Sequence, residues 1–237
     1  IEIALLLGRE YTGQSRFPSQ SWIDEFVQLA ENNWYFGNYT GLLLSLHMCG
    51  DYVEEFLQGK NSLQDEQPRL FKLTDRVQIN THGVANDWAP SPLLSLISIH
   101  SITKQFIFQI DDVNNHIFQY CVAKLHSDED TFVQPLFDLS HGTGRHSTKW
   151  PAACYKVNLH GYAGGLSPTN IEQSLKDIEL VAGSSDIWID METHIRTDGK
   201  FDLQKVTAVM EQLPVIEDKG ILNEEDEVPE SSFNTSS

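Results

Sequence analysis

Pro135-Leu-Phe-Asp-Leu-Ser-His-Gly-Thr-Gly144 and Asn158-Leu-His-Gly-Tyr-Ala-Gly-Gly-Leu-Ser-Pro168 are two apolar runs that carry polar residues and end near glycines. A buried strand that delivers a polar residue and then a glycine turn to one rim is the unit from which a (β/α) barrel builds a phosphate-binding active site. Because both segments have this form, they predict an enzyme with a barrel fold.

The length and composition of the chain favour a single domain of barrel size. The chain has 237 residues, of which 40% are hydrophobic, and α/β barrels of this length form one domain. We expect the barrel to occupy residues 1–214. Residues 215–237 form a tail in which seven acidic residues and one lysine predict a flexible, solvated segment.

The charge of the chain argues against nucleic acid and membrane partners. Lys and Arg number 16 against 34 Asp and Glu, a net charge of −18, which opposes binding to polyanions. The apolar runs fall short of the roughly 20 residues of a membrane span, and no signal-peptide pattern opens the chain. Three scattered cysteines, Cys49, Cys121 and Cys154, favour a reducing compartment. We therefore expect a cytoplasmic protein, whose oligomeric state the sequence leaves open.

Short apolar runs alternate with segments of helical periodicity, as in repeated βα units around a parallel sheet. The predicted fold class is α/β, a TIM (β/α)8-type barrel with seven strands visible in the sequence and the first βα unit missing. The seven expected strands are Glu2–Leu7, Leu42–Cys49, Arg76–Asn80, Gln105–Asp111, Val133–Leu139, Tyr155–His160 and Asp186–Met191.

Polar residues recur two apart near the ends of six of these strands. Residues two apart share a face of a strand, and interior residues at the carboxyl ends form the active rim of a barrel. An unpaired polar group there would cost about 1–3 kcal/mol. The groups either hydrogen-bond to one another as a structural plug or form a ligand site, and six convergent pairs favour the site. The pairs are His47 and Cys49, Gln78 and Asn80, Gln109 and Asp111, Asp138 and Ser140, Asn158 and His160, and Asp190 and Glu192.

Four segments also carry a family resemblance. They are Ser15-Arg-Phe-Pro-Ser19, Val77-Gln-Ile-Asn-Thr-His-Gly83, Phe137-Asp-Leu-Ser-His-Gly-Thr-Gly144 followed by Trp150, and Ala163-Gly-Gly-Leu-Ser-Pro-Thr-Asn170 with Ile189-Asp190. Their order and spacing resemble those of phosphoribosylanthranilate isomerase, a TIM-barrel family of tryptophan biosynthesis. The chain is most similar to uncharacterised bacterial proteins that resemble this isomerase, for which no activity is implied.

The resemblance implies acid/base isomerisation of a small anionic sugar-like metabolite, with no cofactor. Asp138 matches the general acid of the family. The family's KICG strand, whose cysteine is the general base, has no match in the sequence. The base therefore stays open among Cys49, Asp190 and Glu192, and Cys49 is as readily interpreted as a small buried hydrophobe.

The predicted substrate-binding residues come from the resemblance and from the polar rim. Gly164 and Gly165 match a phosphate loop, in which backbone N–H groups approach an anion, and Arg16 matches a substrate-facing arginine. Glycines of a tight turn and a solvated loop arginine are the alternatives. The remaining predicted substrate-binding residues are Asn80, Thr143 and His160.

One departure from the family and two other functions remain open. Glu192-Thr193-His194 replaces a small Ser-Ser-Gly phosphate turn, and its glutamate would repel a phosphate unless His194 or Arg196 offsets the charge. A noncatalytic ligand-binding barrel is one alternative function. The other is a divalent-metal enzyme, for which no local motif exists and whose donors would be His47, Cys49, His160, Asp190 and Glu192.

Overall fold

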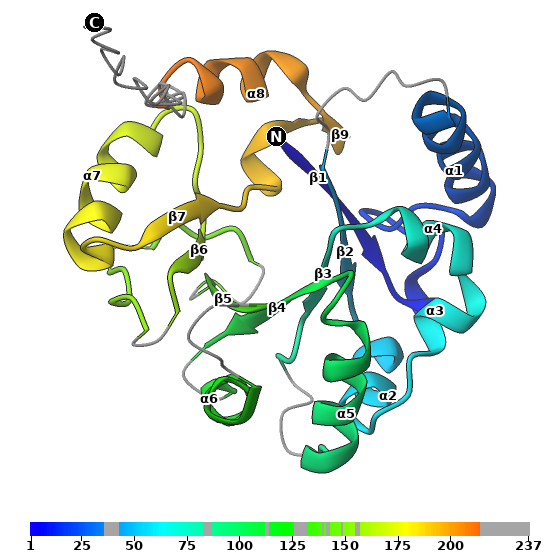
Figure 1. Cartoon of the computed structure of the whole chain (residues 1–237). Coiled ribbons are helices and arrows are strands. Elements are labelled where there is room, and N and C mark those ends of the chain that lie inside the picture. The colour runs from blue at the N-terminus through cyan, green and yellow to red at the C-terminus, as the bar shows by residue number, and fades with distance from the viewer. Residues whose placement is uncertain are drawn as a thin grey trace, which may run out of the picture.

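Seven parallel strands form one sheet in chain order, and the sheet curls into an open, barrel-like shape (Figure 1). The computed structural model describes residues 1–35, 43–82, 87–111, 114–125, 132–138, 140, 143–147, 149–154 and 157–213. The predicted tail at residues 215–237 lies outside these ranges. The strands are β1 (Glu2–Leu7), β2 (Leu43–Met48), β3 (Arg76–Ile79), β4 (Gln105–Ile110), β5 (Val133–Asp138), β6 (Leu159–Ala163) and β7 (Asp186–Ile189).

The described helices lie around the outside of the curled sheet (Figure 1). A short antiparallel hairpin, formed by β8 (Arg196–Thr197) and β9 (Lys200–Phe201), follows β7. Two 3-10 helices, η1 (Arg9–Tyr11) and η2 (Thr193–Ile195), lie in loops. The α-helices are α1 (Gln20–Tyr35), α2 (Asp51–Leu57), α3 (Ser62–Glu66), α4 (Pro68–Leu73), α5 (Pro90–His100), α6 (Asn115–Leu125), α7 (Ile171–Ala182) and α8 (Leu203–Met210). Within the described part of the chain, no helix combines the length and the apolar character that crossing a bilayer requires.

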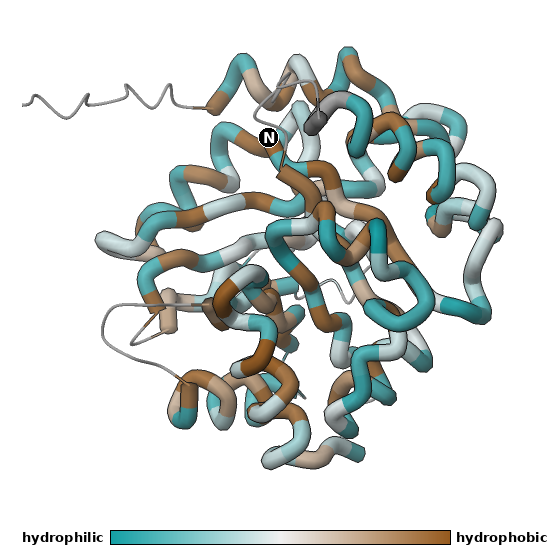
Figure 2. The backbone as a smooth tube through the Cα atoms, turned by 45° about the vertical axis from the view of Figure 1, so that its right-hand side comes forward, coloured by the Kyte–Doolittle hydropathy of each residue, from teal (hydrophilic) through white to brown (hydrophobic). Residues whose placement is uncertain are grey.

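The main core lies between the sheet and the helices. In β4, Phe106 and Phe108 are buried and belong to the same cluster as Phe56 of α2 and Phe118 of α6. Successive side chains of a strand point to opposite faces, so Ile107, between the two phenylalanines, faces the inside of the curl, where it packs with a second, smaller cluster. Hydrophobic and hydrophilic stretches succeed one another along the helices (Figure 2), as expected for helices with one face on a sheet.

The sheet is not closed among the described strands. β1 and β7 each pair on one side only, and a seam separates them (Figure 1). The structure is therefore an α/β fold with a seven-stranded, curled parallel sheet, which is compatible with part of a TIM-type barrel.

The sixth strand lies later in the chain than the sequence predicted. We expected it at Tyr155–His160, but β6 runs from Leu159 to Ala163, and residues 155 and 156 lie outside the described ranges. The reason is Gly161, which resembles a turn residue but lies within the strand. A Cβ atom at Gly161 would lie 2.3 Å from the Trp188 ring, so this glycine allows a close side-chain approach. The other strands begin or end within a few residues of their predicted bounds.

Candidate functional site

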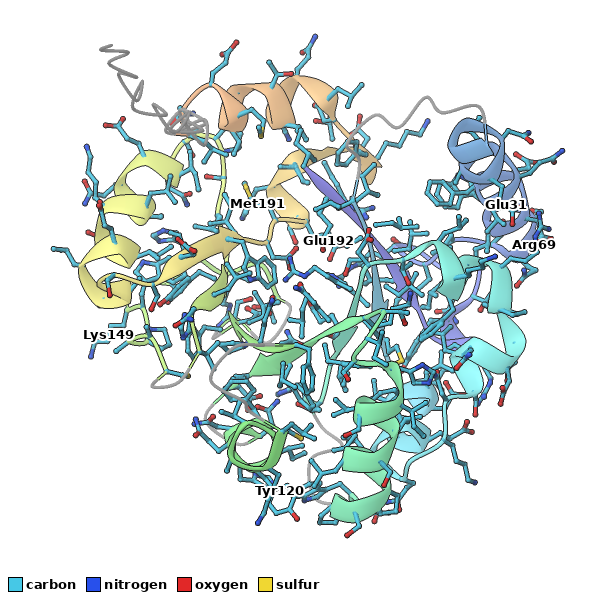
Figure 3. The ribbon with its side chains drawn as sticks, in the orientation of Figure 1. Glu31, Arg69, Tyr120, Lys149, Met191 and Glu192 are labelled. Atoms are coloured by element: carbon cyan, nitrogen blue, oxygen red, sulfur yellow. The ribbon has the colours of Figure 1, made fainter. Side chains whose placement is uncertain are left out.

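A pocket of about 210 Å³ lies at the carboxyl ends of the strands. Each of the seven strands, or the turn directly after it, contributes a side chain or backbone to its wall. Figure 3 shows Glu192 inside the curl of the sheet, whereas Tyr120 and Lys149 lie at the periphery. One residue from each strand or following turn is Leu6, His47, Gln78, Gln109, Asp138, Ala163 and Asp190.

The pocket brings together most of the residues that the sequence predicted. It also contains Gln78, Gln109 and Ser140, which strand alternation had placed at the rim without assigning them to the site, and Thr193 and His194 from the turn after β7. Phe17, which belongs to the Ser15–Ser19 motif but was not assigned to the site, lines the pocket beside Arg16. The predicted site residues that line the pocket are Arg16, Cys49, Asn80, Asp138, Gly164, Gly165, Asp190 and Glu192.

His160 and Thr143 do not line the pocket. Because β6 begins at Leu159, His160 shares a face with Tyr162 and is fully buried in the outer core. Its Nε2 atom accepts a hydrogen bond from the Cys154 N–H at 2.8 Å, and burial lowers the pKa of the ring. Thr143 donates its hydroxyl to the Ser140 carbonyl at 2.6 Å and so stabilises a turn.

Asp138, at the end of β5, holds a carboxylate surrounded by donors. Gln109 Nε2 donates to Oδ2 at 2.7 Å, and the hydroxyl and N–H of Ser140 donate to Oδ1 at 2.6 and 3.0 Å. Hydrogen bonds to an ionised acceptor are stronger than bonds between neutral groups. The three donors therefore fix the orientation of the Asp138 carboxyl group toward the pocket.

Asp190 lies in a different environment directly after β7. Its side chain opens onto the pocket but is otherwise surrounded by protein. Burial raises the pKa of Asp190 to about 6, and the negative charges of Asp138 and Glu192 add to the effect, while Arg76 opposes it. Asp190 therefore keeps its proton at mildly acidic pH, where an ordinary aspartate has lost it.

Cys49 ends a chain of amide hydrogen bonds. Gln78 Nε2 donates to Asn80 Oδ1 at 2.7 Å, and Asn80 Nδ2 donates to Cys49 Sγ at 3.2 Å. Burial raises the pKa of the Cys49 thiol, although the Asn80 bond and Arg16 act in the opposite direction. The neutral thiol is thus favoured, which makes Cys49 a weak base at neutral pH.

Arg16 and Glu192 form an ion pair across the mouth of the pocket. Arg16 Nε donates to Glu192 Oε1 at 2.7 Å, and Nη2 donates to Oε2. Arg196 Nη2 lies 3.3 Å from Glu192 Oε1. Arg16 has a φ of 77°, a conformation that is unfavourable for a residue with a side chain. Glu192 thus occupies the face of Arg16 that the sequence predicted for a substrate.

Packing at Gly165 and backbone conformation at Gly164 account for the glycines of the predicted phosphate loop. Gly165 has a φ of 67°, and a Cβ atom there would lie 2.3 Å from the His146 nitrogen. The Ser147 N–H donates to the Gly164 carbonyl at 3.1 Å. Close packing therefore requires a glycine at position 165, whether or not an anion binds beside it. At Gly164 a Cβ atom would meet nothing closer than 3.6 Å, and the φ of 124° is what favours glycine there.

The arrangement that a metal enzyme needs is not present among the described residues. They contain no group of three or more His, Cys, Asp or Glu side chains placed to hold a metal ion. Of the donors that the sequence suggested, His160 lies outside the pocket. Burial lowers the pKa of His47 to about 4, so this imidazole is neutral at pH 7, which is the form that binds a metal; it is the lack of a suitable group among the described residues that argues against the metal site.

Comparisons with protein-family models, with curated proteins and with solved structures give no match to this chain. The fold and the pocket define an α/β protein with a curled parallel sheet and a carboxylate-rich pocket at the carboxyl ends of its strands. The resemblance to phosphoribosylanthranilate isomerase stays a prediction.

Proposed function

We propose that the pocket is the active site of an enzyme that isomerises a small sugar-like metabolite by general acid/base catalysis. The observation that supports this most is the contrast between Asp138 and Asp190, two carboxyl groups that line one pocket in different surroundings. Enzymes that run acid and base chemistry together use carboxyl groups whose environments favour opposite protonation states.

The surroundings suggest a role for each carboxyl group. Asp190, whose pKa is raised to about 6 by burial and by neighbouring charges, is the proton donor. Asp138, whose two oxygens both accept hydrogen bonds, is the proton acceptor. The family resemblance implied that Asp138 is the acid, and the hydrogen bonds around it favour the opposite role.

The reaction that fits this pair converts an aldose into a ketose. Asp138 takes the proton from the carbon next to the carbonyl carbon, and the electrons of that C–H bond form a C=C double bond. The carbonyl π electrons move to the oxygen, which takes the proton of Asp190. Asp138 then gives its proton to the former carbonyl carbon, and Asp190 takes the proton of the hydroxyl on the neighbouring carbon, whose oxygen becomes the ketone oxygen. Both carboxyl groups thereby return to their starting states.

The other base candidates are less suited to this role. The pKa of Cys49 is raised by burial, so the thiolate is scarce at neutral pH. Glu192 is held by Arg16 and Arg196, and leaving those partners would cost it both ion pairs. We therefore assign Cys49 to the pocket wall and Glu192 to binding.

The test is solvent proton exchange. The protein is incubated in D2O with a panel of aldoses and, separately, with phosphoribosylanthranilate. Proton NMR follows the appearance of deuterium at the carbon next to the carbonyl, and fluorescence follows the conversion of phosphoribosylanthranilate. We expect Asp138→Asn and Asp190→Asn to abolish the exchange that the native protein shows. Asp186→Asn is the matched control, because Asp186 is exposed at the amino end of β7.

Two outcomes would contradict the proposal. One is full exchange in a folded Asp138→Asn variant, which removes Asp138 as acceptor. The other is binding of a sugar with no exchange in the native protein, which would favour the noncatalytic ligand-binding function.

A further inference from the structure

Arg76 is a buried arginine on the inner face of the curled sheet. It comes two residues before Gln78 on β3, so the two side chains share a face, and Gln78 lines the pocket. The side chain of Arg76 is 11% exposed and is not part of the pocket wall. Arg76 therefore lies one residue layer beneath the pocket.

The side chain of Arg76 crosses the inside of the curl from β3 to β7. These two strands are not neighbours in the sheet, yet the guanidinium carbon of Arg76 lies 4.2 Å from the centroid of the Trp188 ring. Trp188 comes two residues before Asp190, so the two share a face. The positive charge of Arg76 thus lies beneath Asp190, in the layer of Trp188.

One side of the Arg76 guanidinium has no partner. Its Nη1 atom lies 3.1 Å from Glu2 Oε2 in an ion pair. Nε and Nη2 are the two donors that an arginine offers side by side to a carboxylate. Both are buried and have no hydrogen-bond partner among the described residues, so they lose their hydration uncompensated. This side of the guanidinium is therefore available to a second carboxylate.

Asp190 is a second carboxyl group whose charge acts on Arg76. Burial lowers the pKa of Arg76, and the charges of Glu2 and Asp190 act in the opposite direction. The effect is mutual. Burial raises the pKa of Asp190, together with the charges of Asp138 and Glu192, whereas the Arg76 charge lowers it. The position of Arg76 and its charge therefore both connect it to Asp190.

We propose, taking Asp190 as the proton donor of the function proposed above, that Arg76 is the positioning residue that stabilises the carboxylate formed when Asp190 gives up its proton. In that step the proton goes to the carbonyl oxygen of the substrate, and the electrons of the O–H bond stay on Asp190. Burial disfavours the resulting charge, and the unpaired side of the Arg76 guanidinium offsets it without contacting the substrate. His47, whose pKa burial lowers to about 4, is neutral at pH 7 and adds no charge to this site.

The test is a titration of the Asp190 carboxyl carbon by carbon NMR, with the signal assigned through Asp190→Asn. We expect the native midpoint near the pKa of about 6. Arg76→Met should raise the midpoint by at least about 0.5 pH unit, because loss of a cation disfavours the carboxylate. Arg76→Lys keeps the charge and should stay closer to the native midpoint. Arg69→Met is the matched control and should leave the midpoint unchanged, because Arg69 pairs with Glu31 and its side chain is 62% exposed.

Glu2→Gln separates this role from a purely structural one. Arg76→Met and Glu2→Gln both break the ion pair between β1 and β3, so a structural role predicts shifts of the Asp190 midpoint in the same direction. The electrostatic role predicts opposite shifts. Glu2→Gln leaves the Arg76 charge uncompensated and should lower the midpoint by at least about 0.3 pH unit.

Circular dichroism identifies a variant that has unfolded. If Arg76→Met unfolds, the downward shift expected for Glu2→Gln still decides. Shifts in the same direction, or an unchanged midpoint in folded variants, overturn the inference.

Solvent proton exchange on an aldose tests the consequence for catalysis. Because Asp190 becomes a weaker acid, Arg76→Met should lower kcat by at least about threefold at pH 5, and the fall of kcat/KM should begin at a higher pH than in the native protein. A raised KM with native kcat would place Arg76 in binding and overturn its role. Opposite NMR shifts without any exchange in the native protein would exclude the isomerase and leave the action of Arg76 on Asp190 standing. Exchange with an unmoved Asp190 midpoint would do the reverse.

Discussion

Arg16 and Glu192 join the two edges of the open sheet by a side-chain ion pair. Arg16 follows β1 and Glu192 follows β7, and the two residues are separated by 176 positions in the chain. No strand pairing links β1 to β7 among the described residues. This ion pair therefore connects the two edges of the sheet at the mouth of the pocket.

The strained backbone of Arg16 gives a stability prediction. Arg16→Gly and Arg16→Ala both remove the ion pair, which is partly exposed and contributes no more than about 1 kcal/mol. Only the alanine variant keeps a side chain at a φ of 77°. We expect Arg16→Gly to be more stable than Arg16→Ala by about 0.5–1 kcal/mol, measured by urea unfolding. Equal stability of the two variants would show that the loop relaxes.

The raised pKa of Asp190, about 6 against an ordinary value of 3.8, predicts a pH dependence of stability. Between these two values the folded protein binds a proton that the unfolded chain has lost, so stability falls as pH rises through this window. Above pH 6 the buried charge costs up to about 3 kcal/mol. Asp190→Asn should therefore be more stable than the native protein at pH 7 and lose this advantage near pH 4. If the free energies of unfolding of the native protein and of Asp190→Asn differ by the same amount at every pH from 4 to 7.5, the assignment of the raised pKa to Asp190 is wrong.

The same group predicts the pH dependence of turnover. If protonated Asp190 is the donor, kcat/KM falls about tenfold per pH unit above its pKa of about 6. Asp190→Asn should lower kcat/KM by about 10²–10⁴ and should remove the fall above pH 6. The pH–rate profile on any aldose that exchanges in D2O measures both effects. A native profile that is flat from pH 5 to pH 8 would exclude Asp190 as the donor.

Cys49 should be dispensable for chemistry. Burial raises the pKa of its thiol, and Cys49→Ser keeps an acceptor for the amide of Asn80. We expect this variant to keep kcat within about threefold of the native value, in contrast to the loss predicted for a general base. Slow alkylation of Cys49 by iodoacetamide at pH 7, followed by mass spectrometry, tests the scarcity of the thiolate independently. A loss of turnover comparable to that of Asp138→Asn would restore Cys49 as the base.

Gly161 should tolerate no side chain. A Cβ atom there would overlap the ring of Trp188, whose other neighbours include the Arg76 guanidinium at 4.2 Å. We expect Gly161→Ala to destabilise the protein by about 1–3 kcal/mol. Gly183→Ala is a comparison variant: that site has a φ of 64° and no atom within 4 Å, so its loss reports backbone strain, whereas Gly161 has no left-handed φ and its loss reports the overlap with Trp188. If Trp188 causes the loss, Gly161→Ala combined with Trp188→Leu should recover part of the stability.

The sequence predicted the sheet well where hydrophobic runs are bounded by polar residues. β1 has the predicted bounds, and β3, β4 and β5 begin where expected. β6 was displaced because Gly161 has the residue type of a turn, while its actual partner, Trp188, lies on another strand. Local pattern carries no information on such a contact.

The candidate site was predictable to the extent that it follows strand alternation. Asp138, Gln109 and Gln78 share the inner face because each lies at an alternate position near the end of a strand. The engagement of Arg16 by Glu192 could not be predicted in this way, since it joins two loops far apart in the chain. His160 was assigned to the rim from a strand that proved to begin four residues later.

The seam between β1 and β7 is also where we expect the protein to open locally most often. Residues of β5 are buried throughout, whereas those of β7 are partly or fully exposed and most of β1 is only partly buried. Opening at the seam breaks no hydrogen-bonded ladder between the two strands, and the least protected parts of a protein are those with the fewest such bonds. Amide hydrogen exchange should accordingly be slowest in the middle of the sheet and fastest along its two edges. A ligand that reaches the pocket through the seam would then enter where local fluctuation is already least costly.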